Sequence, residues 1–224
     1  DLFYMLMASM RLLPQVVCPR FAPELVFAAI ETHSVRNVLL VPTMIQVLAD
    51  DPRRGAYRLQ SLKDIIYGAS PISEAVLDRA MACFPGVRFT QAYGQTEMSP
   101  VVSILKPAYH ADPNLRGKLR SAGQPMVGVE VRIVDASGRE CPRNVVGEVA
   151  ARGAGVMQGY WNDAAQTAVA LRDGWARTGD GAYLDDDGFL FIVDRVKDMI
   201  VSGGENVYSA EVENAIAQHE AVAT

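Results

Sequence analysis

The chain has 224 residues, of which 50% are hydrophobic and 21% charged, and its formal net charge is −5 at pH 7. So large an apolar fraction excludes a disordered tail, and the acidic balance offers no basic surface for nucleic acid. The three cysteines are far apart and form no CxxC pair, which favours a reduced, cytoplasmic protein with structural thiols. The opening apolar run is interrupted by Arg11 and Pro14, so neither a signal peptide nor a transmembrane segment is expected there.

Helical patterns alternate with short apolar runs as far as about residue 107, which is typical of an α/β layered sheet. A helix is expected over residues 23–34, with His33 packed in the core or at its edge. A strand is expected from 38 to 41, another from 64 to 67 and a third from 87 to 93. After the second strand we expect a turn and then a helix that begins at Pro71, because proline suits the first helical turn.

Glycine-punctuated extended segments follow Lys106 and predict a small β-rich subdomain over residues 116–193. Its expected strands are 129–134, 147–151 and 188–193, with turns at 135–138 and 185–188. A strand at 199–202, the pair Gly203-Gly204 and a helix over 209–219 would begin a further α/β module.

The segment from Gln91 to Glu97 places an aromatic ring, a glycine, a hydroxyl and a carboxylate at the end of an expected strand. These groups suit a nucleotide base, a tight turn, a phosphate and a divalent cation. Mg²⁺ prefers one or two carboxylates together with phosphate oxygens, which Glu97 beside Thr96 and a bound ATP could supply. The alternative is an ordinary strand-end turn with an exposed glutamate.

The segment from Trp175 to Asp180 ends an expected extended stretch on a carboxylate next to a glycine. Such a carboxylate can accept hydrogen bonds from two ribose hydroxyls. The alternative is a turn between two strands, because Gly-Asp is a common turn dipeptide. The strand-to-helix junction at Gly68-Ala69-Ser70 is a third candidate, since ligands collect at such edges of α/β sheets.

Several nucleotide-binding and hydrolase motifs are absent. The chain contains no GxxxxGK[ST], HExxH or GxSxG, and the glycines between 153 and 159 have the wrong spacing for a dinucleotide fingerprint. These absences remove P-loop enzymes, zinc proteases and α/β-hydrolases from consideration.

Five strings in order carry a family resemblance: YGASPIS, QAYGQTE, GEVAARGAGVMQGYWN, WARTGD and DRVKDMIVSGGENVYSAEVEN. Together they cover most of the chain, which resembles the adenylate-forming superfamily of acyl-CoA synthetases, luciferases and peptide-synthetase adenylation domains. The second and fifth strings are most similar to fatty-acid or aryl-acid CoA ligases.

The resemblance implies a site for ATP and Mg²⁺. In it Gly68, Ala69 and Ser70 border the adenine, Tyr93 stacks near it, Thr96 and Glu97 handle the phosphate and the metal, and Asp180 and Arg195 bind the ribose hydroxyls. It further implies a hinge at Lys197, a CoA channel at Gly203 and Gly204, and part of an acyl pocket at Tyr67, Gly68, Ala92, Gly94 and Met98.

The resemblance also implies a domain organisation: an incomplete N-terminal α/β subdomain over 1–115, a β-rich subdomain over 116–194, a hinge over 195–197 and the start of a C-terminal domain over 198–224. A phosphate-binding loop is then expected upstream and a catalytic lysine downstream, so the chain alone is expected to be inactive. His110 and His219 are expected at the surface.

The expected activity is ATP-dependent ligation of a carboxylic acid to CoA, with no transmembrane segment and no nucleic-acid partner. A homodimeric state is left open. The alternatives are an adenylation domain that loads a carrier protein, a luciferase-like oxidase and a non-enzymatic nucleotide-binding relic.

Overall fold

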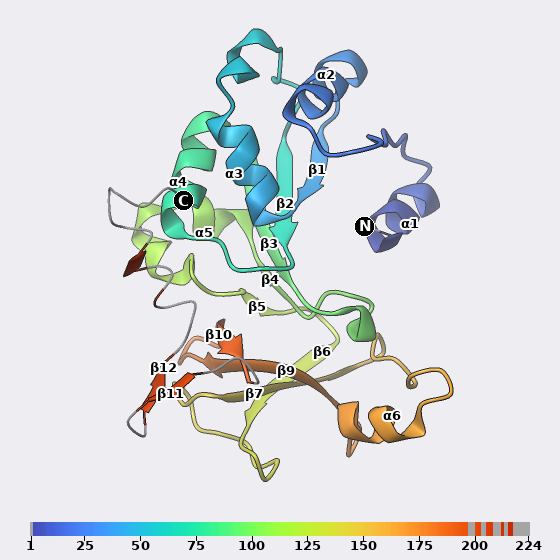
Figure 1. Cartoon of the computed structure of the whole chain (residues 1–224), viewed down its shortest axis with the longest axis vertical. Coiled ribbons are helices and arrows are strands. Elements are labelled where there is room, and N and C mark those ends of the chain that lie inside the picture. Colours follow the sequence, from blue (N-terminus) through green and yellow to red (C-terminus); the bar gives the residue numbers. More distant parts are fainter. Residues whose placement is uncertain (1, 197–199, 203–204, 208–211, 213–214, 217–224) are drawn as a thin grey trace. The chain divides into compact units, whose positions relative to one another are not determined.

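The computed structural model describes residues 2–196, 200–202, 205–207, 212 and 215–216 (Figure 1). The chain forms two compact units, one of residues 1–91 and 106–113 and the other of residues 92–105 and 114–224. The domain boundaries expected at 115, 194 and 197 stay a proposal. Lys197, Gly203, Gly204, Ser209 and His219 lie outside the described residues.

The first unit is built from parallel strands and helices, as its alternating pattern predicts. Strands β1 (Asn37–Leu40) and β2 (Asp64–Gly68) pair in parallel, with Asn37 opposite Asp64. The first sheet has the order β1-β2-β3-β4-β5, with β3 at Arg88–Tyr93, β4 at Ser103–Leu105 and β5 at Gln124–Pro125. The helices of this unit are α1 (Leu2–Met10), α2 (Pro23–His33), α3 (Pro42–Asp50), α4 (Glu74–Cys83), α5 (Pro107–Ala111) and the 3-10 helix η1 (Pro52–Ala56).

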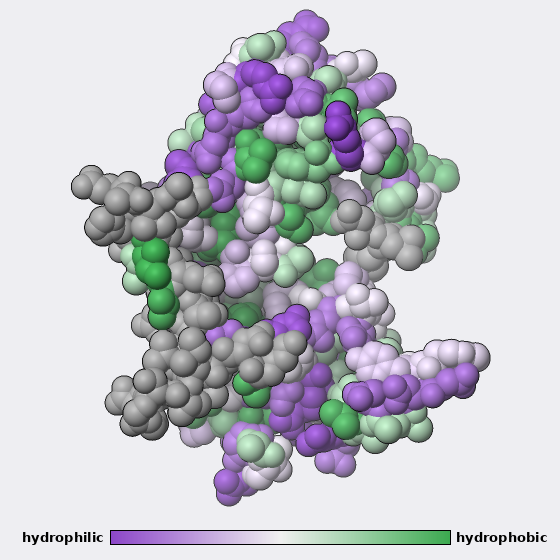
Figure 2. Space-filling view, viewed as in Figure 1, coloured by the Kyte–Doolittle hydropathy of each residue, from purple (hydrophilic) through white to green (hydrophobic). Residues whose placement is uncertain are grey.

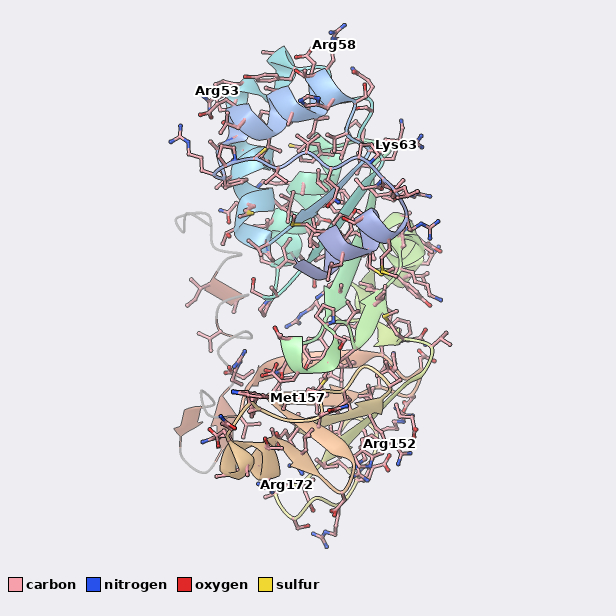
Figure 3. The ribbon with its side chains drawn as sticks, turned by 90° about the vertical axis from the view of Figure 1, so that its right-hand side faces the viewer. Arg53, Arg58, Lys63, Arg152, Met157 and Arg172 are labelled. Carbon is pink, nitrogen blue, oxygen red and sulfur yellow. The ribbon has the colours of Figure 1, made fainter. Side chains whose placement is uncertain are left out.

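The core of this unit lies between the sheet and its helices, where α3 and α4 pack against each other. Its largest fully buried side chains come from α2, α3, α4 and the strands: Phe27, Ile45, Ile65, Tyr67, Leu77 and Phe89. Figure 2 shows hydrophilic side chains gathered over the segment from η1 to β2. Arg53, Arg58 and Lys63 of this segment lie at the surface in Figure 3.

Two expectations for helices α4 and α2 of this unit were wrong. Helix α4 begins at Glu74 instead of Pro71, because the Ser73 hydroxyl caps it by accepting a hydrogen bond from the Val76 backbone N–H at 3.3 Å. His33 is exposed in the last turn of α2, and Phe27 and Ile30 form the packed face of that helix.

The second unit is dominated by an antiparallel sheet of order β10-β9-β7-β6, with β8 paired to β9. Its strands are β6 (Val129–Val134), β7 (Gly147–Gly153), β8 (Leu171–Arg172), β9 (Trp175–Leu184) and β10 (Leu190–Arg195). Helix α6 (Ala164–Ala170) and the 3-10 helices η2 (Thr96–Met98) and η3 (Pro113–Lys118) accompany it, and β11 (Ile200–Ser202) pairs antiparallel with β12 (Glu205–Val207). Strand β3 (Arg88–Tyr93) enters this unit at Ala92, and β4 (Ser103–Leu105) pairs antiparallel with β5 (Gln124–Pro125).

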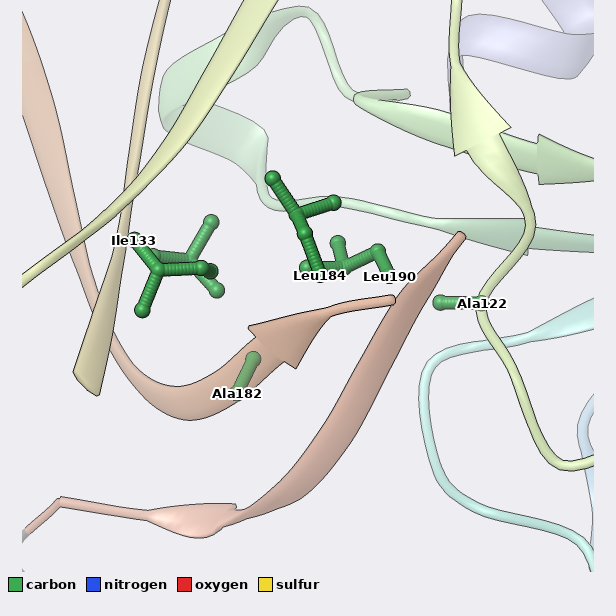
Figure 4. Close-up of a cluster of buried hydrophobic side chains, with 6 residues drawn as sticks. Ala122, Ile133, Ala182, Leu184 and Leu190 are labelled. Carbon is green, nitrogen blue, oxygen red and sulfur yellow. The ribbon is translucent and has the colours of Figure 1, made fainter. Parts of the chain in front are cut away.

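Two hydrophobic clusters stabilise this unit. The first consists of Ala122, Ile133, Val149, Ala182, Leu184 and Leu190 (Figure 4), and the second of Met98, Val102, Ala151 and Ala176. The ring of Tyr93 packs against both clusters. Fully burying one of the larger side chains of these clusters, such as Ile133 or Leu190, stabilises the fold by roughly 1.5–3 kcal/mol.

The sequence predicted most of this sheet correctly. Strand β6 has the expected bounds, and the expected turns at 135–138 and 185–188 are present, with Gly138 and Gly188 at φ of 85° and 77°. Strand β10 begins at Leu190, two residues later than expected, because the turn at 185–188 uses the Phe189 backbone. No helix of the described residues is long and apolar enough to cross a membrane.

Candidate functional site

Strand β9 carries Asp180 in an irregular part of the second sheet. The expectation that the strand ends at Asp180 was wrong, because it continues to Leu184. The register with β7 shifts between Glu148 and Ala150, and the register with β10 shifts between Ile192 and Asp194. Irregularities of this kind re-aim side chains and are common next to active sites.

Asp180 lies on the buried face of β9, where Ala176, Thr178, Ala182 and Leu184 are also buried. Asp180 is only 6% exposed. Ala176 belongs to one hydrophobic cluster and Ala182 to the other, so along the strand the carboxylate falls between two apolar surfaces. A charged group in such a position needs hydrogen-bond partners.

Two side chains from the segment after β3 supply these partners. The Tyr93 hydroxyl donates to Asp180 Oδ2 at 2.6 Å, and Gln95 Nε2 donates to the same oxygen at 3.1 Å. Gln95 Nε2 also donates to the Thr178 carbonyl oxygen at 2.7 Å. Burial, and then the neighbouring Asp180 carboxylate, raise the pKa of Tyr93, so the phenol stays protonated and can act as the donor.

Arg195 of β10 is the cross-strand partner of Asp180. Its Nε lies 3.3 Å from Asp180 Oδ1, and its side chain is 58% exposed. The two residues that were expected to bind the ribose are therefore neighbours. One carboxylate oxygen is occupied by Tyr93 and Gln95, and the other faces an exposed guanidinium.

Glu148 of β7 supports the backbone beside Asp180. Its Oε1 accepts from the Gly179 N–H at 2.9 Å, and its Oε2 accepts from Arg177 Nε at 2.9 Å. Gly179 has φ of 73°, a left-handed conformation that favours glycine. The half-buried Glu148 carboxylate therefore fixes the turn of backbone that aims Asp180.

The segment expected to bind phosphate and metal forms the short helix η2. Thr96 is exposed and Glu97 is half-buried. Glu97 Oε1 accepts from the Tyr160 hydroxyl at 2.8 Å, and the Glu97 carbonyl oxygen accepts from the Met157 N–H at 2.8 Å. Met157 and Tyr160 lie in the loop between β7 and α6, in which Figure 3 labels Met157.

Gly94 precedes this helix at a close approach of two backbone segments. A Cβ at this position would lie 1.9 Å from the Pro100 carbonyl oxygen and 2.9 Å from the Val102 nitrogen. Its small size is therefore needed for packing within the segment itself. Ala92 is half-buried, and Met98 is buried in one of the hydrophobic clusters.

Gly68, Ala69 and Ser70 follow β2 in the first unit. Gly68 is buried, whereas Ala69 and Ser70 are exposed. Ala69 has φ of 71°, which is uncommon for a residue with a side chain and is found most often at turns and functional sites.

Tyr67 precedes this turn and is fully buried. Its hydroxyl lies 2.9 Å from Nε2 of His110, and His110 Nδ1 lies 3.2 Å from the Lys106 carbonyl oxygen. A carbonyl can only accept, so Nδ1 carries the proton and Nε2 accepts from Tyr67. The expectation that His110 is a surface residue was wrong, and burial lowers its pKa below the usual range.

Sequence reasoning missed Gln95, Glu148 and Tyr160. Each lies inside a recognised string, but its role depends on a partner distant in the chain: Asp180, Gly179 and Glu97, respectively. The sequence offered one signal for each of them: it is a polar residue inside a matching string, and no role had been assigned to it.

The chain is similar in sequence to proteins of a known family. The model of the AMP-binding enzyme family matches residues 1–161. A feruloyl-CoA synthase from an Amycolatopsis species is 42% identical over 88% of this chain and 38% of that protein. The fatty acid–[acyl-carrier-protein] ligase ScoC of Streptomyces coeruleorubidus is 39% identical over 91% of this chain and 38% of that protein.

A solved structure has the same fold. O-succinylbenzoate coenzyme A synthetase (MenE) from Bacillus subtilis, in complex with ATP and magnesium ion, superposes with a TM-score of 0.85. It is 32% identical and covers 98% of this chain and 44% of that one.

The first, α/β sheet and the second, antiparallel sheet form an α/β protein with the fold of adenylate-forming enzymes. The family match covers more than half of the chain, which therefore belongs to the AMP-binding enzyme family. The chain spans about two fifths of the length of the relatives it matches, for example 38% of the feruloyl-CoA synthase.

Proposed function

We propose that this chain forms the nucleotide-binding part of an ATP-dependent ligase that joins a carboxylic acid to a thiol. The observation that carries the proposal is the Asp180 carboxylate, which is buried between apolar clusters and held by Tyr93, Gln95 and Arg195. Such an arrangement is costly to build, and it presents a preorganised acceptor to a ligand.

The geometry at Asp180 fits a ribose. Tyr93 and Gln95 both donate to Oδ2, which fixes the carboxylate plane and leaves Oδ1 beside the exposed Arg195. A ribose hydroxyl can donate to Oδ1 while Arg195 donates to a second ribose oxygen. Each such charge-assisted bond contributes about 1.5–3 kcal/mol. The adenine is proposed to lie near Tyr93 and the Gly68-Ala69-Ser70 turn.

The segment Thr96-Glu97 fits the phosphates and Mg²⁺. The Thr96 hydroxyl is exposed, and Glu97 presents a hard oxygen donor. In this family of sites Mg²⁺ takes most of its remaining ligands from the nucleotide and from water. When bound, the ion would neutralise charge on the ATP phosphates, and Glu97 would hold it in place.

The proposed reaction has two balanced steps. The substrate carboxylate attacks the α-phosphorus of ATP, a P–O bond to pyrophosphate breaks, and an acyl-adenylate forms. A thiol then attacks the acyl carbon, and AMP leaves with the electrons of the broken C–O bond while the thiol proton passes to solvent. Positioned charge suffices for both steps, so no protein nucleophile is required.

The acid and the thiol carrier are proposed by similarity. A feruloyl-CoA synthase and an acyl-carrier-protein ligase are almost equally similar to this chain, at 42% and 39% identity. We propose a fatty or aryl acid as substrate and CoA as the acceptor. The second relative supports the alternative in which a phosphopantetheinylated carrier protein takes the acyl group.

The acyl pocket is proposed to include Tyr67, Gly68, Ala92, Gly94 and Met98. We further propose the hinge at Lys197 and the thiol channel at Gly203 and Gly204.

The proposal is tested on the full-length protein that carries this chain. AMP release from Mg-ATP is measured over a panel of short, long and aromatic acids, with CoA, with a carrier protein and with neither. Release that requires an acid and CoA supports the CoA ligase. Release that requires the carrier supports the alternative, and no AMP release with any acid contradicts both. The 224-residue chain alone is proposed to be inactive, which acid-dependent AMP formation by the purified chain would disprove.

Asp180→Ala should weaken the use of ATP. Loss of the ribose acceptor is expected to raise the KM for ATP by about 10- to 100-fold, since one charge-assisted bond is worth about 1.5–3 kcal/mol. The substitution also leaves Tyr93 and Gln95 without an acceptor, so Asp180→Asn, which keeps the volume, is measured beside it. Asp173→Asn, in the exposed turn between β8 and β9, is the control. An unchanged KM for ATP in both Asp180 variants would show that the ribose assignment is wrong.

A further inference from the structure

The loop between β7 and α6 is joined to helix η2 at the middle residue of that helix and at the residue that follows it. The Met157 N–H donates to the Glu97 carbonyl oxygen at 2.8 Å, and Ser99 Oγ donates to the Gly155 carbonyl oxygen at 2.7 Å. A Cβ on Gly155 would lie 3.0 Å from the Met98 carbonyl oxygen, so the backbones are in close contact. The loop therefore moves with the segment that carries Thr96 and Glu97.

Tyr160 has a fixed backbone within this loop. Its N–H donates to Thr167 Oγ1 at 2.9 Å, and Thr167 Oγ1 in turn donates to the Asp163 carbonyl oxygen at 2.7 Å. A Cβ on Gly159 would lie 2.8 Å from Thr167 Cγ2, so only glycine fits beside this anchor. Helix α6, which Asp163 caps, thereby sets the position from which the Tyr160 ring extends.

The phenol of Tyr160 reaches back to the carboxylate of Glu97, with a distance of 2.8 Å from its oxygen to Oε1. Tyr160 is 41% exposed, so this hydrogen bond is not needed to satisfy a buried polar group. It occupies one oxygen of the carboxylate and fixes its plane. A hydrogen bond from an outer residue to a metal-binding carboxylate orients the ligand and increases metal affinity.

We infer that Tyr160 is a positioning residue for the cation that accompanies ATP: its hydroxyl holds Glu97 in the rotamer that presents the other carboxylate oxygen to the ion. The inference rests on the proposed function of Glu97 as the metal-binding residue. Tyr160 itself touches neither the ion nor the reacting atoms. It acts through Glu97, and helix α6 and the loop of residues 153–162 supply the rigid support.

The test measures cation binding directly. Mn²⁺ is titrated into the full-length protein in the presence of a non-hydrolysable ATP analogue, and free Mn²⁺ is followed by electron paramagnetic resonance. Tyr160→Phe removes one oxygen from an exposed ring and should leave the circular dichroism spectrum unchanged. The dissociation constant for Mn²⁺ should rise by about tenfold, the lower end of the range for an outer residue of a metal site. At saturating Mg²⁺ the kcat of Tyr160→Phe should stay within about twofold of the wild type.

Three variants separate the alternatives. Ser99→Ala removes one hydrogen bond between the loop and η2 without touching the phenol, so it should weaken Mn²⁺ binding less than Tyr160→Phe does. Tyr183→Phe removes a hydroxyl from the ring that stacks on Phe191 and should leave Mn²⁺ affinity unchanged. Glu97→Gln should weaken Mn²⁺ binding at least as much as Tyr160→Phe. If Glu97→Gln weakens binding and Tyr160→Phe does not, the inference is wrong and the proposed metal site stands. If neither variant weakens binding, the metal site and the inference both fail. If Ser99→Ala lowers Mn²⁺ affinity as much as Tyr160→Phe does, Tyr160 only anchors the loop and the inference is overturned.

Discussion

Tyr93→Phe removes a single oxygen atom, the donor at 2.6 Å from Asp180 Oδ2. The ring keeps its packing against both hydrophobic clusters, so no cavity is created. Hydrogen bonds to charged groups contribute about 1.5–3 kcal/mol, and Asp180 keeps Gln95 and Arg195 as partners. We therefore expect the free energy of unfolding to fall by about 1.5–2 kcal/mol, the lower part of that range.

Two assays on the full-length protein test this expectation. The apparent Tm should fall by about 2–4 °C per kcal/mol if the unit that unfolds has about 150–250 residues, and by less if it is larger. The KM for ATP should rise by about tenfold, because Asp180 is no longer held in the orientation that accepts the ribose. Tyr183→Phe, in which the ring stacks on Phe191 at a centroid distance of 4.9 Å, is the matched control. A Tyr93→Phe protein with the Tm and the ATP kinetics of the wild type would refute the account of Asp180 given above.

Two further substitutions test the supporting structure. Gly94→Ala would place a Cβ 1.9 Å from the Pro100 carbonyl oxygen, and backbone cannot move aside cheaply. We therefore expect the free energy of unfolding, measured by thermal denaturation, to fall by about 1–3 kcal/mol or more. A wild-type Tm would contradict that contact. Burial lowers the pKa of His110 below the value of about 6.5 that histidine has in the unfolded chain, so the folded state binds fewer protons between these two values. Stability is therefore fully present above about pH 6.5 and falls as the pH drops through that window, and His110→Gln should flatten this part of a plot of Tm against pH. An identical slope in the variant would show that His110 does not contribute.

Local patterns predicted most of the secondary structure. Helix α2 begins at Pro23 and strand β6 spans Val129–Val134, as expected, because proline fixes the first turn and β-branched residues alternate along the strand. Errors arose where a local signal competed with a partner elsewhere in the chain. Burial of His110, for example, depends on Tyr67, which lies 43 residues earlier in the sequence.

The sequence predicted which residues belong to the site, but not how their side chains are arranged. Asp180 and Arg195 were expected to act together and are cross-strand partners with atoms 3.3 Å apart. Gln95 was not expected, because the contact that gives it a role spans 85 residues. The side-chain pairing across sheets depends on register, and the sequence pattern alone does not determine the register of an irregular strand.

The interpretation of Asp180 as the end of a strand has a clear physical origin. Gly179 and Gly181 flank the carboxylate, and glycines on both sides of an aspartate are typical of a turn. In the structure Gly179 adopts φ of 73° within the strand, and Gly181 lies close to the Asp194 carbonyl oxygen, 3.4 Å from the position of an added Cβ. The glycines accommodate a distortion of β9 without ending it.

The alternation of side chains between the two faces of β9 also limits which deletions this strand can accept. Successive side chains point to opposite faces, so removing one residue between Arg177 and Gly181 would turn the Asp180 carboxylate towards solvent and send its neighbour into the apolar clusters. Removing two residues would return the Asp180 side chain to the buried face, but it would erase the irregularity that pairs Asp180 with Arg195. Neither deletion preserves both properties, so the number of residues in this part of β9 is itself part of what positions Asp180 beside Arg195.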